Sequence, residues 1–444
     1  MAMTGMQIYK LLPRTNCKDC GLPTCMAFAM QVAAKQRSLE DCPHITEESK
    51  ENLAESSAPP MKLIRVGPDE KRFEFGQETV MHRHEEKFHR HTGVAARIPA
   101  SLTGDELKDR LDKINKSVFM RVGERLYIEF CAIELDGVED PTARTKQIID
   151  DCCLPVILIS EDAGVLKTVA EATKGERPLI YRASESNIDA FAEVAADTKC
   201  SLAVGASDLE TLADLTKKAK DKGVEDIVLS FICENLGETV RNLTIARRAA
   251  LKKQFRPLGY PSMVEVKSDS PELEPAMAAA CAAKYAGIVI VNGIEPWQVL
   301  PVLTTVQDIY TDPQVPNTVE SKLHEIGSPN ENSPVLFTTN FSLTYFSVEG
   351  EVERSKIPAF ICVVDTEGLG VLNAYAGDKI SADKVIKALK DQAVADKVKH
   401  RKLIIPGLLP IFRAEIEDSS EWTEVIIGPE TSREIPSFLQ STWK

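Results

Sequence analysis

Residues 201–231 read SLAVGASDLETLADLTKKAKDKGVEDIVLSF. A short apolar run at Ser201–Val204 precedes a helix-like segment at Leu209–Lys220, and a second apolar run follows at Asp226–Phe231. Nearly continuous apolar strands that alternate with helices are typical of a parallel sheet covered by helices. This stretch therefore predicts an α/β fold built from β–α units.

The same alternation extends along the middle of the chain. Eight runs are expected to form strands: Gly93–Ile98, Leu126–Phe130, Leu154–Ile159, Pro178–Tyr181, Ser201–Val204, Asp226–Phe231, Met263–Val266 and Gly287–Val291. Helical periodicity marks Asp189–Asp197 and Thr239–Lys252 between them. Eight such units over about 220 residues favour a (β/α)8 TIM barrel. An open doubly wound sheet remains the alternative, because one sequence does not show closure.

Polar and proline-rich segments divide the chain. Its length of 444 residues suggests about three domains, at roughly 150 residues each. We expect a cysteine-bearing unit at 1–57, a linker at 58–92, the barrel at 93–311, a linker at 312–333 and a Rossmann-like α/β domain at 334–444. In the last domain, strands are expected at Val335–Thr338, Ala359–Val364, Leu403–Ile405 and Val425–Ile427, with a helix near Asp383–Asp396.

Charge and hydropathy exclude several classes of function. The chain has 53 Lys and Arg against 67 Asp and Glu, a formal net charge of −14, which argues against nucleic-acid binding. It has no signal-peptide pattern and no apolar run long enough to span a membrane, so we expect a cytoplasmic protein. Its eleven cysteines are then not expected to form disulfides.

Four cysteines near the start of the chain follow the spacing C-x2-C-x4-C-x16-C. They are Cys17, Cys20, Cys25 and Cys42, and Pro43 follows the last of them. Four thiolates without a histidine suit a [4Fe–4S] cluster, and a proline after the last ligand recurs in such sites. A structural zinc ion is the less favoured alternative, because it usually takes two CxxC knuckles and only one is present. A helix is expected over Met26–Gln36.

A second candidate for metal binding is the run His82–His91, which holds four of the seven histidines. The run is dense in charge and lies in the expected connector. We therefore interpret it as a solvated linker rather than as a metal site.

Glycines follow the strands of the C-terminal domain, where backbone amides can approach a large flat or anionic ligand. Gly368 and Gly370 suggest a dinucleotide fingerprint, but Asn373 occupies the place of its third glycine, so this match is weak. The loops indicate a ligand site without naming the ligand.

The combination resembles a known family. The opening Gln7–Pro13, the cysteine spacing, the barrel-like middle and the stretch Asp365–Val371 are similar to the large (gamma) subunits of corrinoid/iron–sulfur proteins from the acetyl-CoA synthase/decarbonylase (Wood–Ljungdahl) system of anaerobes. The resemblance covers the whole chain. It implies that the four cysteines bind the cluster and that the C-terminal domain binds a cobamide. The residues expected to line the corrin are Thr339, Asn340, Thr344, Gly368, Leu369, Gly370, Val371, Leu372, Gly407, Gly428 and Pro429.

The resemblance also implies a role as a methyl-group carrier. The cobamide would be held base-off, in keeping with the absence of a D-x-H-x-x-G motif from this chain. Its Co(I) state would accept a methyl group from methyl-tetrahydrofolate or another methyl-pterin on a partner methyltransferase. The group would pass to the Ni–Fe–S cluster of acetyl-CoA synthase/CO dehydrogenase, and the [4Fe–4S] cluster would reactivate Co(II). A small subunit would complete a heterodimer.

Two other functions stay open. The barrel could itself bind a pterin and make the chain a methyltransferase with an iron–sulfur electron-transfer domain. The chain could also be an electron-transfer scaffold, in which the barrel serves assembly alone.

Overall fold

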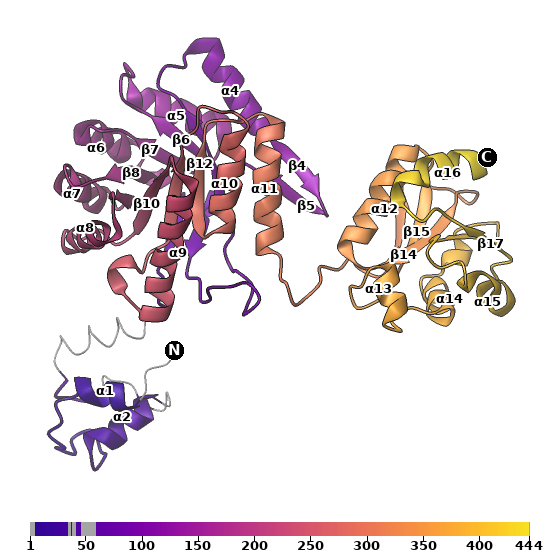
Figure 1. Ribbon diagram of the computed structural model, residues 1–444, viewed down its shortest axis with the longest axis horizontal. Helices are drawn as coiled ribbons and strands as arrows, with labels where there is room; N and C mark the ends of the chain where they lie inside the picture. Colours follow the sequence, from indigo (N-terminus) through magenta and orange to yellow (C-terminus); the bar gives the residue numbers. More distant parts are fainter. Residues whose placement is uncertain (1–4, 34–36, 38–40, 46–58, 444) are drawn as a thin grey trace.

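A closed barrel of eight parallel strands forms the centre of the computed structural model (Figure 1). The structure describes residues 5–33, 37, 41–45 and 59–443. The barrel strands are β3 (Gly93–Ile98), β6 (Phe130–Glu134), β7 (Val156–Ile159), β8 (Leu179–Ala183), β9 (Ser201–Gly205), β10 (Ile227–Cys233), β11 (Ser262–Val266) and β12 (Ala286–Val291). The surrounding helices are α4 (Gly104–Lys116), α5 (Pro141–Cys152), α6 (Ala163–Ala172), α7 (Ile188–Thr198), α8 (Leu209–Asp221), α9 (Leu236–Lys253), α10 (Leu273–Ala283) and α11 (Pro296–Tyr310). The closed strand order confirms the (β/α)8 barrel over the open sheet.

One expected barrel strand is wrong in position. The run Leu126–Phe130 was expected to enter the barrel, but the barrel strand is β6, which begins at Phe130. Residues before it form β5 (Glu124–Tyr127), the second arm of an antiparallel hairpin with β4 (Val118–Arg121). Apolar residues continue from the hairpin into the barrel strand with little interruption, so the apolar pattern does not show where one ends and the other begins.

A second hairpin closes one end of the barrel. It pairs β1 (Leu63–Val66) with β2 (Phe73–Gly76) and buries its apolar side chains against the inward-facing residues of the barrel strands. A Cβ atom on Gly287 would lie 2.7 Å from the Phe75 ring, so glycine on β12 makes room for it. This corrects the expectation of a polar linker over residues 58–92, because part of that segment belongs to the barrel core.

A buried ion pair fixes the rest of this segment to α9. Arg247 and Glu78 are 4% and 5% exposed and lie 3.4 Å apart. Glu78 Oε1 also accepts the backbone N–H of His89 and of Arg90, both at 2.9 Å. The guanidinium lies 4.7 Å from the ring centre of Phe88 and also donates to a backbone carbonyl. Such a pair is costly to break, since either partner alone would be a buried unpaired charge.

Two histidines of the same segment lie beside carboxylates, one within the segment and one just before β6. His89 lies 3.2 Å from Glu86, and His91 lies 3.3 Å from Glu129. Among the described residues, this segment contributes no group of three side chains placed to hold one metal ion. It packs along the barrel instead of standing free as a solvated linker.

The C-terminal domain is a five-stranded sheet with helices on both faces. The strand order is β13-β15-β14-β16-β17, in which β13 alone is antiparallel. The strands are β13 (Leu323–Ile326), β14 (Val335–Thr339), β15 (Ala359–Val364), β16 (Lys402–Ile405) and β17 (Glu424–Ile427). Helices α12 (Ser342–Ser355) and α16 (Ile435–Thr442) pack on one face, and α13 (Val371–Ala376), α14 (Ala382–Asp391) and α15 (Phe412–Ser419) pack on the other. This is the expected Rossmann-like arrangement. Strand β13 lies within 312–333, so part of that expected linker belongs to the sheet.

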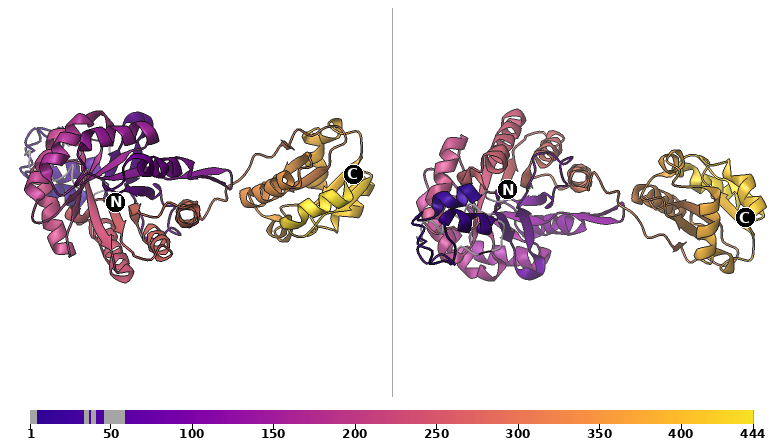
Figure 2. Two further views of the ribbon diagram at one scale, coloured as in Figure 1. Left: turned by 90° about the horizontal axis from the view of Figure 1, so that it is seen from above. Right: turned by 90° about the horizontal axis from the view of Figure 1, so that it is seen from below.

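The chain folds into three separate parts (Figures 1 and 2). The N-terminal helices α1 (Gly5–Leu11) and α2 (Cys25–Ala33) lie beside the barrel, away from the C-terminal domain. The β4–β5 hairpin extends from the barrel toward the C-terminal domain. There the ring of Phe346 on α12 lies against Gly123 at the hairpin turn. Among the described residues, every helix is too short or too polar to cross a membrane.

The expected boundary between the first unit and the barrel falls partly on undescribed residues. The helix expected over Met26–Gln36 is present as α2, and its last expected residues lie outside the described part. Residues 46–58, which include the expected boundary between positions 57 and 58, also lie outside it.

Candidate functional site

A cavity of about 480 Å³ opens at the carboxyl ends of the C-terminal strands. Strand β14 lies between β15 and β16, so the chain changes direction across the sheet there. In open α/β sheets this switch point is where ligands bind, because the loops diverge and leave a crevice. Loops after all four parallel strands line the cavity. Its walls are mainly apolar, and Leu343 and Leu372 at its edge are 50% and 56% exposed.

The structure places six of the expected corrin-lining residues in this cavity. They are Thr344, Gly370, Val371, Leu372, Gly428 and Pro429. The other five, Thr339, Asn340, Gly368, Leu369 and Gly407, are not among the residues that line it. Four of these five shape the loops around the cavity, and Thr339 ends the strand beneath it.

Asn340 holds the loop that follows β15. Its side-chain oxygen accepts the backbone N–H of Thr366 and of Gly368, each at 3.0 Å, and its side-chain nitrogen donates to Asp365 at 2.9 Å. The side chain is buried and its hydrogen-bonding capacity is used within the protein. Asn340 therefore acts as a positioning residue for the 365–370 loop. Leu369 of that loop packs on the apolar core of the domain.

Two glycines bring the loops after β16 and β17 into backbone contact. A Cβ atom on Gly407 would lie 2.5 Å from the carbonyl oxygen of Gly428, and the Gly407 N–H donates to the Pro429 carbonyl at 3.1 Å. Gly368 is similarly constrained by a φ of +76° and by Pro316, whose Cβ would lie 2.8 Å from its own. These glycines were identified from the sequence, but their role was not. Their role is to let the loops pack in close contact with neighbouring residues.

The sequence did not single out Thr338, although it lines the cavity. Its hydroxyl and that of neighbouring Thr339 are buried without a hydrogen-bond partner. A buried hydroxyl of this kind costs free energy unless a partner satisfies it. The apolar walls suit the face of a large flat macrocycle, and the unpaired Thr338 hydroxyl suits an amide group at the edge of a corrinoid. The cavity thus fits a corrinoid in its chemistry.

Among the residues that the structure describes, no histidine lines this cavity. His400, the one histidine after residue 333, uses both ring nitrogens elsewhere. Its Nε2 bonds the Ser333 carbonyl at 2.9 Å, its Nδ1 accepts the N–H of Lys402 at 3.2 Å, and its ring packs on Trp443. It is therefore held within the domain and away from the ligand crevice.

Three of the four N-terminal cysteines contribute to a small apolar core that α1 and α2 share. Cys25 and Cys42 are buried in this core, Cys20 packs against it and Cys17 is exposed. Asn16 Oδ1 accepts the Cys25 N–H at 2.8 Å, which ties the loop to the start of α2. Positive φ angles recur at Asn16, Lys18 and Gly21. Backbone of this kind turns successive N–H groups to one side, where they attract an anion such as a thiolate-bound cluster.

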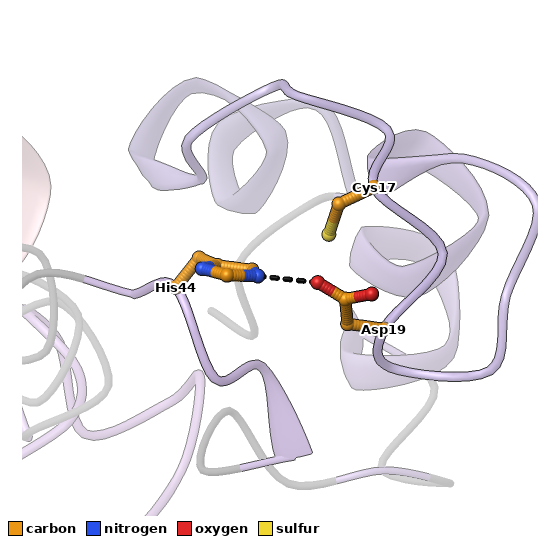
Figure 3. Close-up of side chains that lie close together, drawn as sticks. All are labelled: Cys17, Asp19 and His44. Carbon is orange, nitrogen blue, oxygen red and sulfur yellow. Dashed lines mark hydrogen bonds and ion pairs between the residues drawn. The ribbon is translucent and has the colours of Figure 1, made fainter.

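The side chains of Asp19 and His44 lie beside Cys17 and were not identified from the sequence (Figure 3). His44 Nε2 lies 2.5 Å from Asp19 Oδ2, and the ligand atoms of Cys17, Asp19 and His44 all lie within 4.8 Å of one another. The hydrogen bond with His44 lowers the pKa of Asp19 below its ordinary value, and a bond from Cys17 acts in the same direction. Asp19 and His44 are 25 positions apart in the sequence, so no local motif predicts that they pair.

Comparison with known proteins places this geometry in a family. Over 99% of both chains, the sequence is 39% identical to the "Corrinoid/iron-sulfur protein large subunit" of Moorella thermoacetica. It is 34% and 36% identical to the "Acetyl-CoA decarbonylase/synthase complex subunit gamma" of Methanothermobacter thermautotrophicus and of Methanopyrus kandleri, and 99% of this chain is covered in both cases. The chain belongs to the family of corrinoid/iron–sulfur protein large subunits.

Two family models agree with this assignment. Residues 63–439 match the model described as "CO dehydrogenase/acetyl-CoA synthase delta subunit", and residues 12–44 match "Putative Fe-S cluster". The second match spans all four cysteines of the N-terminal unit. The resemblance inferred from the sequence is confirmed, and the corrinoid/iron–sulfur family takes its name from the two cofactors that it implies.

Proposed function

We propose that this chain carries a methyl group between two partner enzymes of the acetyl-CoA synthase system. When bound, the corrinoid supplies a cobalt centre that accepts and donates the methyl group, and the [4Fe–4S] cluster supplies an electron that restores oxidised cobalt. The observation that carries the proposal is the crevice at the β14 switch point, which combines apolar walls with the unpaired hydroxyl of Thr338. Family membership supports both cofactors.

The residues of this crevice would bind and orient the corrinoid. Thr338 and Thr344 offer hydroxyls, and the glycine loops allow the backbone to approach the ring closely. Asn340 keeps the 365–370 loop in place, and Gly407 keeps the two later loops together. Because no imidazole lines the crevice, we propose that cobalt takes no nitrogen ligand from this chain. Loss of an axial donor favours reduction of the metal.

Cys17, Cys20, Cys25 and Cys42 are the proposed ligands of the [4Fe–4S] cluster. Their unit lies beside the barrel and away from the C-terminal domain that holds the crevice (Figures 1 and 2). Transfer of an electron between the two sites therefore requires movement of a unit, as does exposure of the corrinoid to two partners. The described segment between α11 and β13, residues 311–322, is a place for this movement.

The proposed partners are a small corrinoid/iron–sulfur subunit, a methyltransferase that holds methyl-tetrahydrofolate or another methyl-pterin, and acetyl-CoA synthase/CO dehydrogenase. Archaeal relatives are named as subunits of an acetyl-CoA decarbonylase/synthase complex, which supports the last of these. The exposed Leu343 and Leu372 at the edge of the crevice offer an apolar surface that a partner would cover.

The barrel interior gives no support to a pterin site on its axis. Glu265 is buried there, accepts a hydrogen bond from Tyr181 at 2.6 Å and pairs with Arg97. Arg97 also lies 3.2 Å from Glu134. Burial raises the pKa of Tyr181, so the phenol stays neutral beside this carboxylate. These groups are already paired with one another, so they do not by themselves mark a pterin site, and family membership is what favours the carrier over the methyltransferase.

An EPR spectrum of the chain purified without oxygen tests the proposal. We expect one cobalt per chain and a Co(II) signal without nitrogen superhyperfine splitting. A split signal would contradict the absence of a nitrogen ligand but keep the carrier role. Iron without cobalt would contradict the carrier role and favour the electron-transfer scaffold.

A further inference from the structure

The N-terminal unit carries a second set of metal-binding groups beside the proposed cluster ligands (Figure 3). A sulfur of Cys17, a carboxylate oxygen of Asp19 and a ring nitrogen of His44 all lie within 4.8 Å of one another. The three side chains converge from two loops that lie far apart in sequence. The other proposed cluster ligands, Cys20, Cys25 and Cys42, do not belong to this group.

The spacing distinguishes this group from a cluster site. Ligands of a single ion must all reach one point, whereas each thiolate of a four-iron cluster binds a different iron and stands further from the others. One thiolate, one imidazole and one carboxylate form a donor set that suits a borderline divalent ion such as Zn²⁺ or Fe²⁺. Three protein ligands leave an open coordination position, as in zinc sites that exchange their fourth ligand.

We propose that Cys17, Asp19 and His44 bind one divalent transition-metal ion when the cluster is absent. The site shares Cys17 with the proposed [4Fe–4S] cluster. The inference therefore rests on the proposed function as far as Cys17 is a cluster ligand. Occupation of one site therefore excludes the other. A ferrous ion held here would lie next to the remaining cluster ligands before assembly, and a zinc ion held here would block assembly by retaining Cys17.

Asp19 and His44 are already oriented for metal binding. His44 and Asp19 are hydrogen-bonded at 2.5 Å, so both side chains are oriented toward Cys17 without an ion. Binding would replace this hydrogen bond with bonds to the metal and release the thiol proton of Cys17, because the thiolate is the ligand. The exposure of Asp19 and His44 leaves a path for the ion to enter.

The test is zinc binding by the full chain after iron has been removed with a chelator under anaerobic conditions. Zn²⁺ affinity is measured by competition with a chromophoric chelator. We expect His44→Ala and Asp19→Ala each to weaken binding by more than about 10- to 100-fold, the loss seen when only an outer-shell group of a zinc site is removed, because each is a direct ligand. Cys25→Ala and Cys42→Ala should change it less than about twofold. His84→Ala, which removes an exposed histidine elsewhere, is the matched control.

Zinc K-edge absorption gives an independent readout. The proposed site predicts one sulfur and two lighter donors, whereas zinc in the four cysteines would show four sulfurs. An unchanged affinity in His44→Ala together with loss in Cys25→Ala would overturn the proposal in favour of that tetrathiolate site. Equal zinc binding by cluster-loaded chain would overturn the sharing of Cys17.

The same variants separate this inference from the cluster assignment. His44→Ala should still take up four irons on reconstitution, while Cys25→Ala should not. If Cys25→Ala keeps its cluster, the proposed cluster ligands are wrong, but the zinc result stands on its own.

Discussion

The side-chain oxygen of Asn340 lies 3.0 Å from the backbone nitrogen of Gly368 and accepts its hydrogen bond. One residue at the end of β14 thus fixes the loop that follows the neighbouring strand β15. Gly368 in turn has a φ of +76°, a conformation that other residues rarely adopt. The two positions form a unit that sets the shape of the ligand crevice without lining it.

Replacement of Asn340 tests this unit. Asn340→Ala removes the acceptor for two backbone N–H groups, at Thr366 and Gly368. We expect a loss of about 1–3 kcal/mol in the free energy of unfolding of the C-terminal domain. Corrinoid binding, measured by absorbance after gel filtration, should weaken with it. Asn332→Ala, on an exposed turn of the same domain, should change neither. Full corrinoid binding by Asn340→Ala would show that the loop holds without its anchor.

Gly407 offers a second test of the crevice. In Gly407→Ala the new methyl would meet the Gly428 carbonyl at 2.5 Å, a backbone atom that cannot rotate away. We expect the loops after β16 and β17 to separate, at a cost of about 1–3 kcal/mol, with weaker corrinoid binding. Gly350→Ala is the matched control, because a Cβ at this helical position meets nothing within 4 Å. Thermal unfolding of both variants measures the difference, and equal melting temperatures would contradict the close contact.

The pair Arg247 and Glu78 makes a prediction about the barrel. Arg247→Met leaves the buried Glu78 carboxylate without its partner. We expect a loss of about 3–5 kcal/mol, measured by denaturant unfolding. Lys252→Met removes an exposed pair on the same helix, with Glu85, and should cost less than about 1 kcal/mol. If the double variant Arg247→Met/Glu78→Met is as unstable as the single one, the cost does not come from the orphaned charge.

The barrel was predictable from sequence because its strands are buried on both faces and stand out as short apolar runs. The closing hairpin was not. Phe73 and Phe75 alternate with charged residues over only four positions, and the flanking segment reads as polar. The burial of Phe75 depends on a distant glycine, Gly287, which no local pattern connects to it. Tertiary packing therefore decides the structure of the segment that was expected to be a linker.

In the candidate sites, too, the features of local sequence were predictable and the contacts between distant residues were not. Glycines after strands located the crevice, since the ends of parallel strands meet at one edge. The sequence could not separate Gly370, which faces the cavity, from Gly407, which packs on another loop. Thr338 was missed because its hydroxyl matters only as a buried group without a partner. The cysteines could be identified from their characteristic spacing, whereas Asp19 and His44 come together only in the folded chain.

The cysteine assignment is tested by iron and sulfide content. Cys25→Ala and Cys42→Ala each remove a proposed ligand of the [4Fe–4S] cluster, so we expect reconstituted protein to hold far less than four irons per chain. The unit is small and depends on the metal for stability, so proteolysis within residues 1–57 should also increase. Cys200→Ala removes a buried thiol of the barrel and should keep the full iron content. Normal iron in both N-terminal variants would exclude these ligands.

The contact between Gly123 and Phe346 predicts how the C-terminal domain is placed. A Cβ at position 123 would lie 2.3 Å from the Phe346 ring, so Gly123→Ala should push the domain off the hairpin. Gly137→Ala is the matched control: its φ of +79° is almost the same as the +77° at Gly123, but a Cβ there meets nothing within 4 Å. The backbone strain should destabilise both variants equally, by about 1–2 kcal/mol. Only Gly123→Ala should alter the small-angle scattering profile, toward a larger radius of gyration, while corrinoid binding stays unchanged because Gly123 lies outside the crevice. Identical profiles for the two variants would show that the hairpin does not hold the domain in solution.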